Sequence, residues 1–115
     1  MMNESFDHGL NRVTLVGRLG RAPEMRYTPT GKPVASFSIV TTHTYVASND
    51  ERQHETDWFN VVVWGNLAEE CKSALRKGQP VYVEGRIKTR RWRDETNAQH
   101  SRAEVVAQRV HALGA

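Results

Sequence analysis

VYVEGRIKTRRWR, residues 81–93, follows a Lys-Gly-Gln-Pro break and reads as one long strand. Its odd positions are apolar or small, namely Val81, Val83, Gly85, Ile87 and Thr89. Its even positions are long and polar or aromatic, namely Tyr82, Glu84, Arg86, Lys88, Arg90 and Trp92. Because strand side chains point alternately to opposite faces, we expect the odd set to face a core and the even set to form an outer surface.

Cations and an indole ring share this outer surface. Between Arg76 and Arg93 the chain has seven Lys and Arg residues and one acid, although its formal net charge is only +3. Positive charge concentrated on one element is typical of a surface that contacts phosphates. A flat ring among cations suits a ligand that is anionic and carries stackable rings, which favours single-stranded nucleic acid. The even-face residues that carry this prediction are Arg86, Lys88, Arg90 and Trp92.

A second aromatic strand is expected over residues 56–65, TDWFNVVVWG. Its odd positions, Phe59, Val61 and Val63, suit a core. Its even face carries Asn60 between two indoles, Trp58 and Trp64, which lie six residues apart. The two tryptophans could belong to a core or could offer further rings for bases to stack on.

The remaining elements define the fold class. Strands are also expected over 12–19, 34–45 and 102–113, a connection over 20–32, a hairpin loop over 46–55 and a turn over 94–99. Val105, Val106 and Val110 are the expected core residues of the last strand. The one convincing helix covers 66–76, with Asn66 as its cap and a Leu67, Cys71 and Leu75 stripe facing inward.

Five strands with one helix between the third and fourth predict an all-β OB-fold, a five-stranded Greek-key barrel. A parallel α/β sheet would need more helices, and an immunoglobulin-like sandwich about seven strands. We expect one domain over residues 11–113, preceded by a flexible N-terminal arm, residues 1–10.

Several function classes are disfavoured by composition. Cys71 is the single cysteine and the five histidines lack ligand spacing, so we expect neither a metal site nor a cofactor. No apolar run has the ~20 residues of a membrane helix, and the N-terminus lacks signal-peptide features. A cytoplasmic location is expected. Acids at 50, 51, 55 and 57 lie in or beside a predicted loop without a partner motif, which argues against an enzyme such as a nuclease or deaminase.

Three blocks, NRVTLVGRLGRAPEMRYTPTG (11–31), TDWFNVVVWGNLAE (56–69) and LRKGQPVYVEGRIKTRRWRD (75–94), together resemble the DNA-binding domain of bacterial-type single-stranded DNA-binding proteins (SSB). The resemblance covers nearly the whole chain. It implies an OB-fold that assembles as a homotetramer and binds single-stranded DNA with little sequence preference. It also implies a role in replication, recombination and repair at the nucleoid.

The resemblance also implies a set of binding residues. Bases stack on aromatics that fall here on Tyr45, Trp58, Trp64 and Trp92. Tyr45 stands where Trp is more frequent, Trp64 where Phe is frequent, and Asn97 at a turn that commonly has Gly. The full set of predicted DNA-binding residues is Arg12, Tyr45, Trp58, Asn60, Trp64, Lys77, Arg86, Lys88, Arg90 and Trp92.

Typical members continue into a Gly/Pro/Gln-rich linker and an acidic tip, whereas this sequence stops at Ala115. Recruitment of repair and replication proteins through such a tail is therefore not expected from this chain. It is either a shortened protein or a short form. The alternative functions are an OB-fold RNA-binding or replication-restart module and a purely structural interaction domain.

Overall fold

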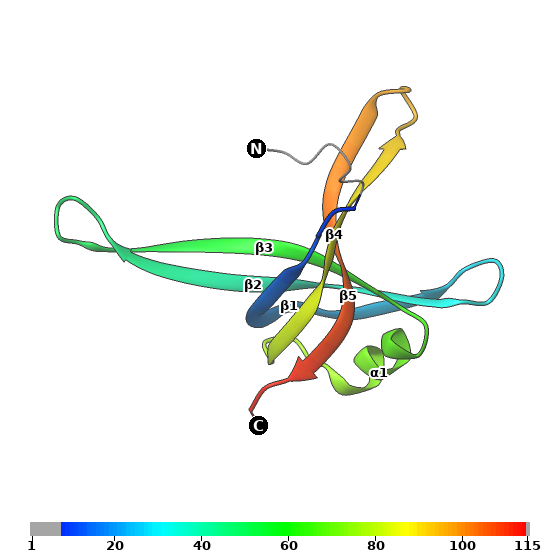
Figure 1. Ribbon diagram of the computed structural model, residues 1–115, viewed down its shortest axis with the longest axis horizontal. Helices are drawn as coiled ribbons and strands as arrows, with labels where there is room; N and C mark the ends of the chain where they lie inside the picture. Colours follow the sequence, from blue (N-terminus) through cyan, green and yellow to red (C-terminus); the bar gives the residue numbers. More distant parts are fainter. Residues whose placement is uncertain (1–7, 115) are drawn as a thin grey trace.

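The computed structural model describes residues 8–114, which form five strands and one helix (Figure 1). Most of the predicted N-terminal arm therefore lies outside the described residues. The elements in chain order are β1 (Val13–Tyr27), β2 (Pro33–Val46), β3 (Arg52–Trp64), α1 (Asn66–Ala74), β4 (Pro80–Arg93) and β5 (Gln99–Ala112).

The five strands close into a barrel in the order β1-β2-β3-β5-β4. Every neighbouring pair is antiparallel except β3 and β5, which run parallel and are joined by two register pairs, Val61–Val105 and Val62–Val106. β1 is shared between two partners, because residues 13–18 pair with β4 and residues 18–27 pair with β2. The predicted five-stranded barrel with a helix between the third and fourth strands is confirmed.

The core consists of the inward-facing side chains of all five strands. Phe37, Ile39, Val61, Val63, Val81 and Val83 are fully buried in it. The helix α1 covers one end of the barrel through Ala68 and Cys71, both buried. Burial raises the pKa of the Cys71 thiol to about 11, with Glu70 adding to the shift, so this cysteine is a neutral apolar side chain.

The ends of the helix differ from the prediction. Gly65, with φ 69°, occupies the N-cap position, so Asn66 is the first helical residue and not the cap. A positive φ is readily adopted by glycine, and here it lets the chain turn from β3 directly into the helix. The helix ends at Ala74, because Leu75 already has an extended backbone and turns its side chain into the core.

Three hairpins project beyond the barrel (Figure 1). Residues 20–27, expected as a connection, continue β1, and the loop expected over 46–55 shrinks to residues 47–51. Residues 20–27 were missed because two register irregularities interrupt the alternation of β1, although Met25 packs against the core. Residues 52–55 were missed because a two-stranded hairpin outside a core needs only backbone pairing. Its side chains are free of the apolar alternation from which strands are recognised.

Two glycines allow strands to approach closely. A Cβ on Gly17 would overlap the Val40 carbonyl oxygen and would lie 2.8 Å from Ile39 Cγ2. The irregularities of β1 fall later, between Leu19 and Arg21 and between Arg21 and Glu24. A Cβ on Gly85 would overlap the Val106 carbonyl oxygen and would lie 2.8 Å from Ala107 Cα.

The Gly85 crossing changes which residues face the core. The β4–β5 register shifts between Glu84 and Gly85, so β5 has one extra residue there and its alternation reverses. Val106 therefore faces outward, contrary to the prediction, while Ala107 is buried. Ile87 is 47% exposed rather than in the core, because β4 leaves the barrel beyond Gly85.

Candidate nucleic-acid interface

A groove of about 370 Å³ lies on the outer face of the barrel. Its floor is formed by β2 and β3, with Ser36, Asn60 and Val62 among the lining residues, and β5 adds Val106. Ser36 and Val62 are register partners, so the floor follows two strands that pair continuously. The floor is mixed in character, with small polar and aliphatic groups side by side.

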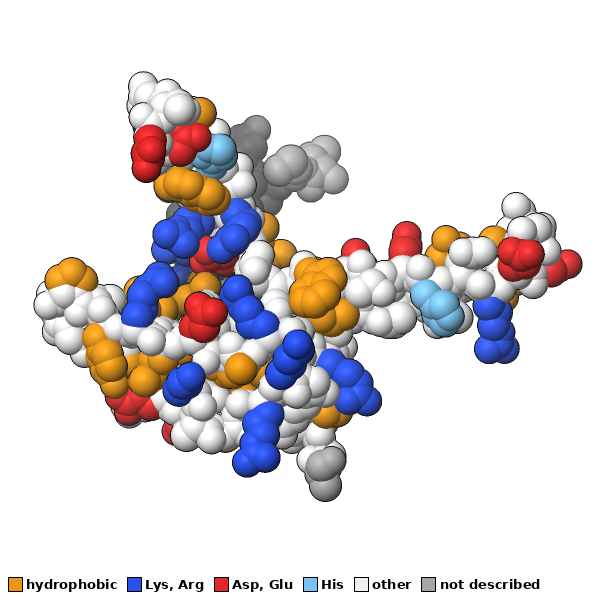
Figure 2. Space-filling view, turned by 180° about the vertical axis from the view of Figure 1, so that it is seen from behind, with side chains coloured by type: hydrophobic (Ala, Val, Ile, Leu, Met, Phe, Trp, Pro, Cys, Tyr) orange, Lys and Arg blue, Asp and Glu red, His pale blue; other side chains and the backbone are white. Residues whose placement is uncertain are grey.

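Cations line the two sides of this groove. Arg21 and Arg26 come from β1, on one side of the floor. Lys88 and Arg90 from β4, with Arg102 from β5, come from the other. Figure 2 shows Lys and Arg side chains gathered in the hollow between projecting hairpins. A groove with cations along both sides can hold a polyanion along its length.

Three indoles lie along or beside the groove. Trp64 lines it, is 42% exposed and has the Lys32 ammonium 5.2 Å from its ring centroid. Trp58 follows on the same face of β3, is 63% exposed and lies over Gly20, where any Cβ would overlap its ring. Trp92 is 39% exposed on the β4–β5 hairpin, with the Arg90 guanidinium 5.6 Å from its ring.

The structure brings together much of the predicted binding set. Asn60, Trp64, Lys88 and Arg90 line the groove. Trp58 and Trp92 are exposed on the strand faces that continue from it. Arg86 is paired with Val106, which itself lines the groove.

The other three predicted residues lie elsewhere. Lys77 lines a separate hollow together with Gly20 and Val40, beside Trp58. Arg12 lies 3.5 Å from Glu84 on the outer surface of β4. Tyr45 lies near the tip of the β2–β3 hairpin. Alternation places its side chain on the opposite face of the hairpin from Trp58, and its ring stacks on His43 with 6.3 Å between the ring centroids.

Four charged groove residues were absent from the predicted set: Arg21, Arg26, Arg102 and Glu104. The two β1 arginines were missed because residues 20–32 were assigned to a connection. The two β5 residues could have been found from the sequence. The turn at Asp94 pairs Lys88 with Glu104 and Arg90 with Arg102, so each lies across the hairpin from a predicted cation.

A polar cluster around Glu84 lies outside the groove. The Tyr82 hydroxyl donates a 2.8 Å hydrogen bond to the Glu84 carboxylate, which lowers the pKa of Glu84, with Arg12 and Arg109 acting in the same direction. The same hydrogen bond raises the pKa of Tyr82. Glu84 is therefore an ionised acceptor that holds neighbouring side chains, and its acidity argues against a role as a proton donor.

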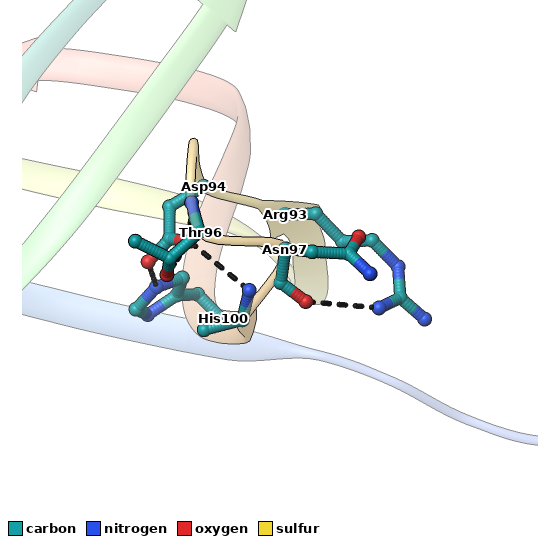
Figure 3. A network of polar contacts seen from close by, with 6 residues as sticks. Arg93, Asp94, Thr96, Asn97 and His100 are labelled. Atoms are coloured by element: carbon teal, nitrogen blue, oxygen red, sulfur yellow. Dashed lines mark hydrogen bonds and ion pairs between the residues drawn. The ribbon is translucent and has the colours of Figure 1, made fainter.

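The tip of the β4–β5 hairpin has its own network (Figure 3). Asp94 accepts hydrogen bonds from the Thr96 hydroxyl at 2.6 Å and from His100 Nε2 at 2.6 Å. Hydrogen bonds from His100, Thr96 and the Ala98 amide lower the pKa of Asp94 to about 2. Asn97 adopts the left-handed conformation with φ 65°, as expected for a residue replacing glycine in this turn. The His100 ring stacks on Trp92 at 5.5 Å.

Two further observations concern metal binding and insertion into a membrane. Within residues 8–114, no group of three or more His, Cys, Asp or Glu side chains could hold a metal ion. The helix in this part of the chain is too short and too polar to cross a membrane.

The chain is similar to known proteins in both sequence and structure. The Single-strand binding protein family matches residues 10–113. Single-stranded DNA-binding protein 1 of Chlorobaculum tepidum is 41% identical over 93% of this chain, and the chain covers 67% of that protein. A single-stranded DNA-binding protein of Neisseria meningitidis is 40% identical over 91% of this chain, and the chain spans only 60% of its length.

Solved structures give the same result. The Plasmodium falciparum SSB in complex with single-stranded DNA superposes with a TM-score of 0.86 at 31% identity, covering 98% of this chain and all of that one. A deletion mutant of the single-stranded DNA-binding protein from Thermus aquaticus gives a TM-score of 0.82 at 29% identity, covering 95% of this chain and 53% of that one. The barrel, the groove and the matched sequence agree, and the chain belongs to the single-strand binding protein family, whose members bind DNA and are not enzymes.

Proposed function

We propose that the groove and its three tryptophans are the site at which this chain binds single-stranded DNA, with little dependence on sequence. The observation that carries the proposal is the groove itself, which has arginines on two sides, Trp64 in its lining and Trp58 beside it. Such a surface attracts phosphates and offers ring faces to bases, and every base has a face that can stack. Duplex DNA hides its ring faces, so it would keep only the ionic part of this attraction.

Base stacking and phosphate neutralisation lead to separate predictions. Stacking on aromatics contributes roughly 1–3 kcal/mol per base by alanine substitution in proteins that bind single strands, this family included. Phosphate neutralisation makes binding salt-dependent, with a slope in log K against log salt of about −0.7 per phosphate on a single strand. We therefore expect tight binding that weakens steadily as salt is added.

Titration of tryptophan fluorescence with poly(dT) at several salt concentrations tests the proposal. We expect strong quenching and a linear salt dependence. Titration with poly(rU) and with duplex DNA of equal length completes the experiment. A clear preference for RNA would favour the RNA-binding alternative, and absence of quenching by any polymer would favour a structural interaction domain.

We also propose that the chain acts as a homotetramer. The resemblance to the family implies this state, and the apolar surface outside the groove supports it. Val16 on β1 is 59% exposed next to its register partner Tyr82, on a part of the barrel that does not line the groove. Light scattering should give four times the chain mass of 13.1 kDa. A dimer or monomer mass over the concentration range of the DNA titration would contradict the proposal.

The cellular role follows from the ligand. Exposed single strands arise in replication, recombination and repair, and we place the protein at these strands in the cytoplasm, at the nucleoid. Its task there is protection of the strand, without chemistry on it.

A further inference from the structure

One acid lies among the cations of the groove. Glu104 on β5 is the single Asp or Glu among the groove-lining residues that the structure describes, and its side chain is only 11% exposed. Its Oε1 lies 3.6 Å from Arg90 Nη1 and 3.8 Å from Arg102 Nη2. One carboxylate oxygen thus faces a guanidinium on each strand of the β4–β5 hairpin.

The position of Glu104 is costly for a surface that binds a polyanion. Burying a carboxylate carries a desolvation penalty that two ion pairs offset only in part. The same charge repels any phosphate that approaches this part of the groove. Lys88, its register partner across the hairpin, also lines the groove, so the acid lies among three cations that each attract phosphates.

A carboxylate discriminates between the two parts of a nucleic acid strand. It repels phosphate oxygens, because it has no proton to donate and carries the same charge. It accepts hydrogen bonds from base amino and imino groups, and apolar ring edges are neutral towards it. A groove with Glu104 in its lining therefore favours bases beside this acid, and the outer cations favour the backbone.

Glu104 also acts on the aromatic part of the site. Arg90, which it faces, lies 5.6 Å from the centroid of the Trp92 ring. An arginine held by a carboxylate on one side and an indole on the other has a restricted orientation. The acid thus orders a cation that would otherwise be free to take a phosphate into the groove.

We propose that Glu104 determines which part of a single strand faces the groove: it repels phosphates from the groove lining around it, so that single-stranded DNA binds with its bases inward and its backbone along the outer cations. The inference rests on the proposed binding of single-stranded DNA and adds to it a residue that selects bases over backbone. Glu104 acts as a specificity determinant through repulsion, and the cations around it supply the affinity.

The test compares two ligands that differ only in their bases. Affinities of wild type and Glu104→Gln are measured by anisotropy for labelled oligo(dT) and for an abasic sugar-phosphate oligomer of the same length. We expect Glu104→Gln to bind the abasic oligomer about tenfold more tightly, with a much smaller gain for oligo(dT). The variant's salt slope for the abasic oligomer should also steepen, because Arg90 and Arg102 become available to phosphates.

Two control variants keep the result interpretable. Glu55→Gln removes the same charge from an exposed position on the β2–β3 hairpin, outside the groove, and should leave the ratio of the two affinities unchanged. Glu104→Asp keeps the charge and should retain most of the discrimination even if the glutamine variant is destabilised.

The outcomes separate this inference from the function on which it rests. If wild type binds oligo(dT) but Glu104→Gln changes both affinities by the same factor, the acid only positions arginines and the inference is overturned. An equal change in Glu55→Gln would reduce the effect to net charge and overturn it as well. Failure of wild type to bind oligo(dT) would instead overturn the proposed function.

Discussion

The β2–β3 and β4–β5 hairpins have the same architecture and opposite character. Each leaves the barrel as a two-stranded antiparallel ribbon and ends in a short turn with one non-glycine residue at positive φ, Asp50 in one and Asn97 in the other. The β2–β3 hairpin carries threonines, histidines and acids beyond the barrel. The β4–β5 hairpin carries Arg86, Lys88, Arg90, Arg91, Arg93 and Arg102.

The difference shows that backbone pairing forms both hairpins, whereas the side chains determine which hairpin lines the groove. Lys88, Arg90 and Arg102 from the β4–β5 hairpin line the groove, whereas no residue of the β2–β3 hairpin between 41 and 57 does. Both hairpins reach out from the barrel, but only the β4–β5 hairpin brings cations to the side of the groove. Four changes test this contrast.

The largest effect is expected at the base of the cationic hairpin. Gly85→Val should destabilise the fold by about 3 kcal/mol, because the new side chain would overlap the backbone of β5 at Val106. Urea denaturation measures the change. Gly9→Val, where nothing lies within 4 Å of a new Cβ, is the control and should leave the midpoint unchanged. Equal stability of both variants would mean that the crossing tolerates a side chain.

Removal of an aromatic ring from each hairpin is expected to have the next largest effect. Trp92→Ala should weaken binding of oligo(dT) by roughly 1–3 kcal/mol. Tyr45→Ala should cost less than about 0.5 kcal/mol, because Tyr45 lies away from the groove, stacked on His43. Isothermal titration with the same oligonucleotide compares the two. A comparable loss in both variants would show that DNA also follows the β2–β3 hairpin, as the family resemblance predicts for Tyr45.

Removal of one cation from each hairpin tests the charge contrast. Lys88→Ala should reduce the salt slope of binding by about 0.7, the share of one phosphate on a single strand. Arg52→Ala removes a cation from the β2–β3 hairpin, outside the groove, and should leave the slope unchanged. The salt slope of each variant is obtained from affinities measured at four or more salt concentrations. A reduced slope in both variants would extend the phosphate path beyond the groove.

The smallest effect concerns pH at the tip of the β4–β5 hairpin. The pKa of Asp94 falls from its ordinary value of 3.8 to about 2, chiefly through the hydrogen bond from His100. The folded turn therefore favours the carboxylate, so its stabilisation is full above 3.8 and is lost as pH falls towards 2. The indole resonance of Trp92, stacked on His100, should follow this titration in NMR spectra. In Asp94→Asn it should not shift over that range, whereas Glu95→Gln should behave as wild type.

The barrel was predictable because its strands face a core. Val81 and Val83, or Phe37 and Ile39, alternate with polar residues, and the helix 66–74 lies between the third and fourth strands as expected. The hairpin lengths were not predictable in the same way. Irregular register hides the alternation of residues 20–27, and residues 52–55 lie outside the core and have no apolar period, so both look like loops although their backbones pair.

The site was predictable where a chemical signal coincided with alternation. Lys88, Arg90 and Trp64 combine a cation or a ring with an outward position, and all three line the groove. Glu104 carries neither a cation nor a ring, so only the register from the turn at Asp94, which pairs it with Lys88, could have indicated it. Its importance depends on three-dimensional proximity to Arg90 and Arg102, which follows only from the register of the hairpin.

The parallel contact between β3 and β5 has a consequence for dynamics. The barrel closes there through two register pairs that join distant parts of the chain, which makes it the shortest pairing in the sheet. Val62 and Val106, one from each side of this seam, both line the groove. A strand of DNA in the groove would cross the seam and oppose its local opening. Amide hydrogen exchange at these residues should therefore slow on DNA binding by more than exchange at the hairpin turns.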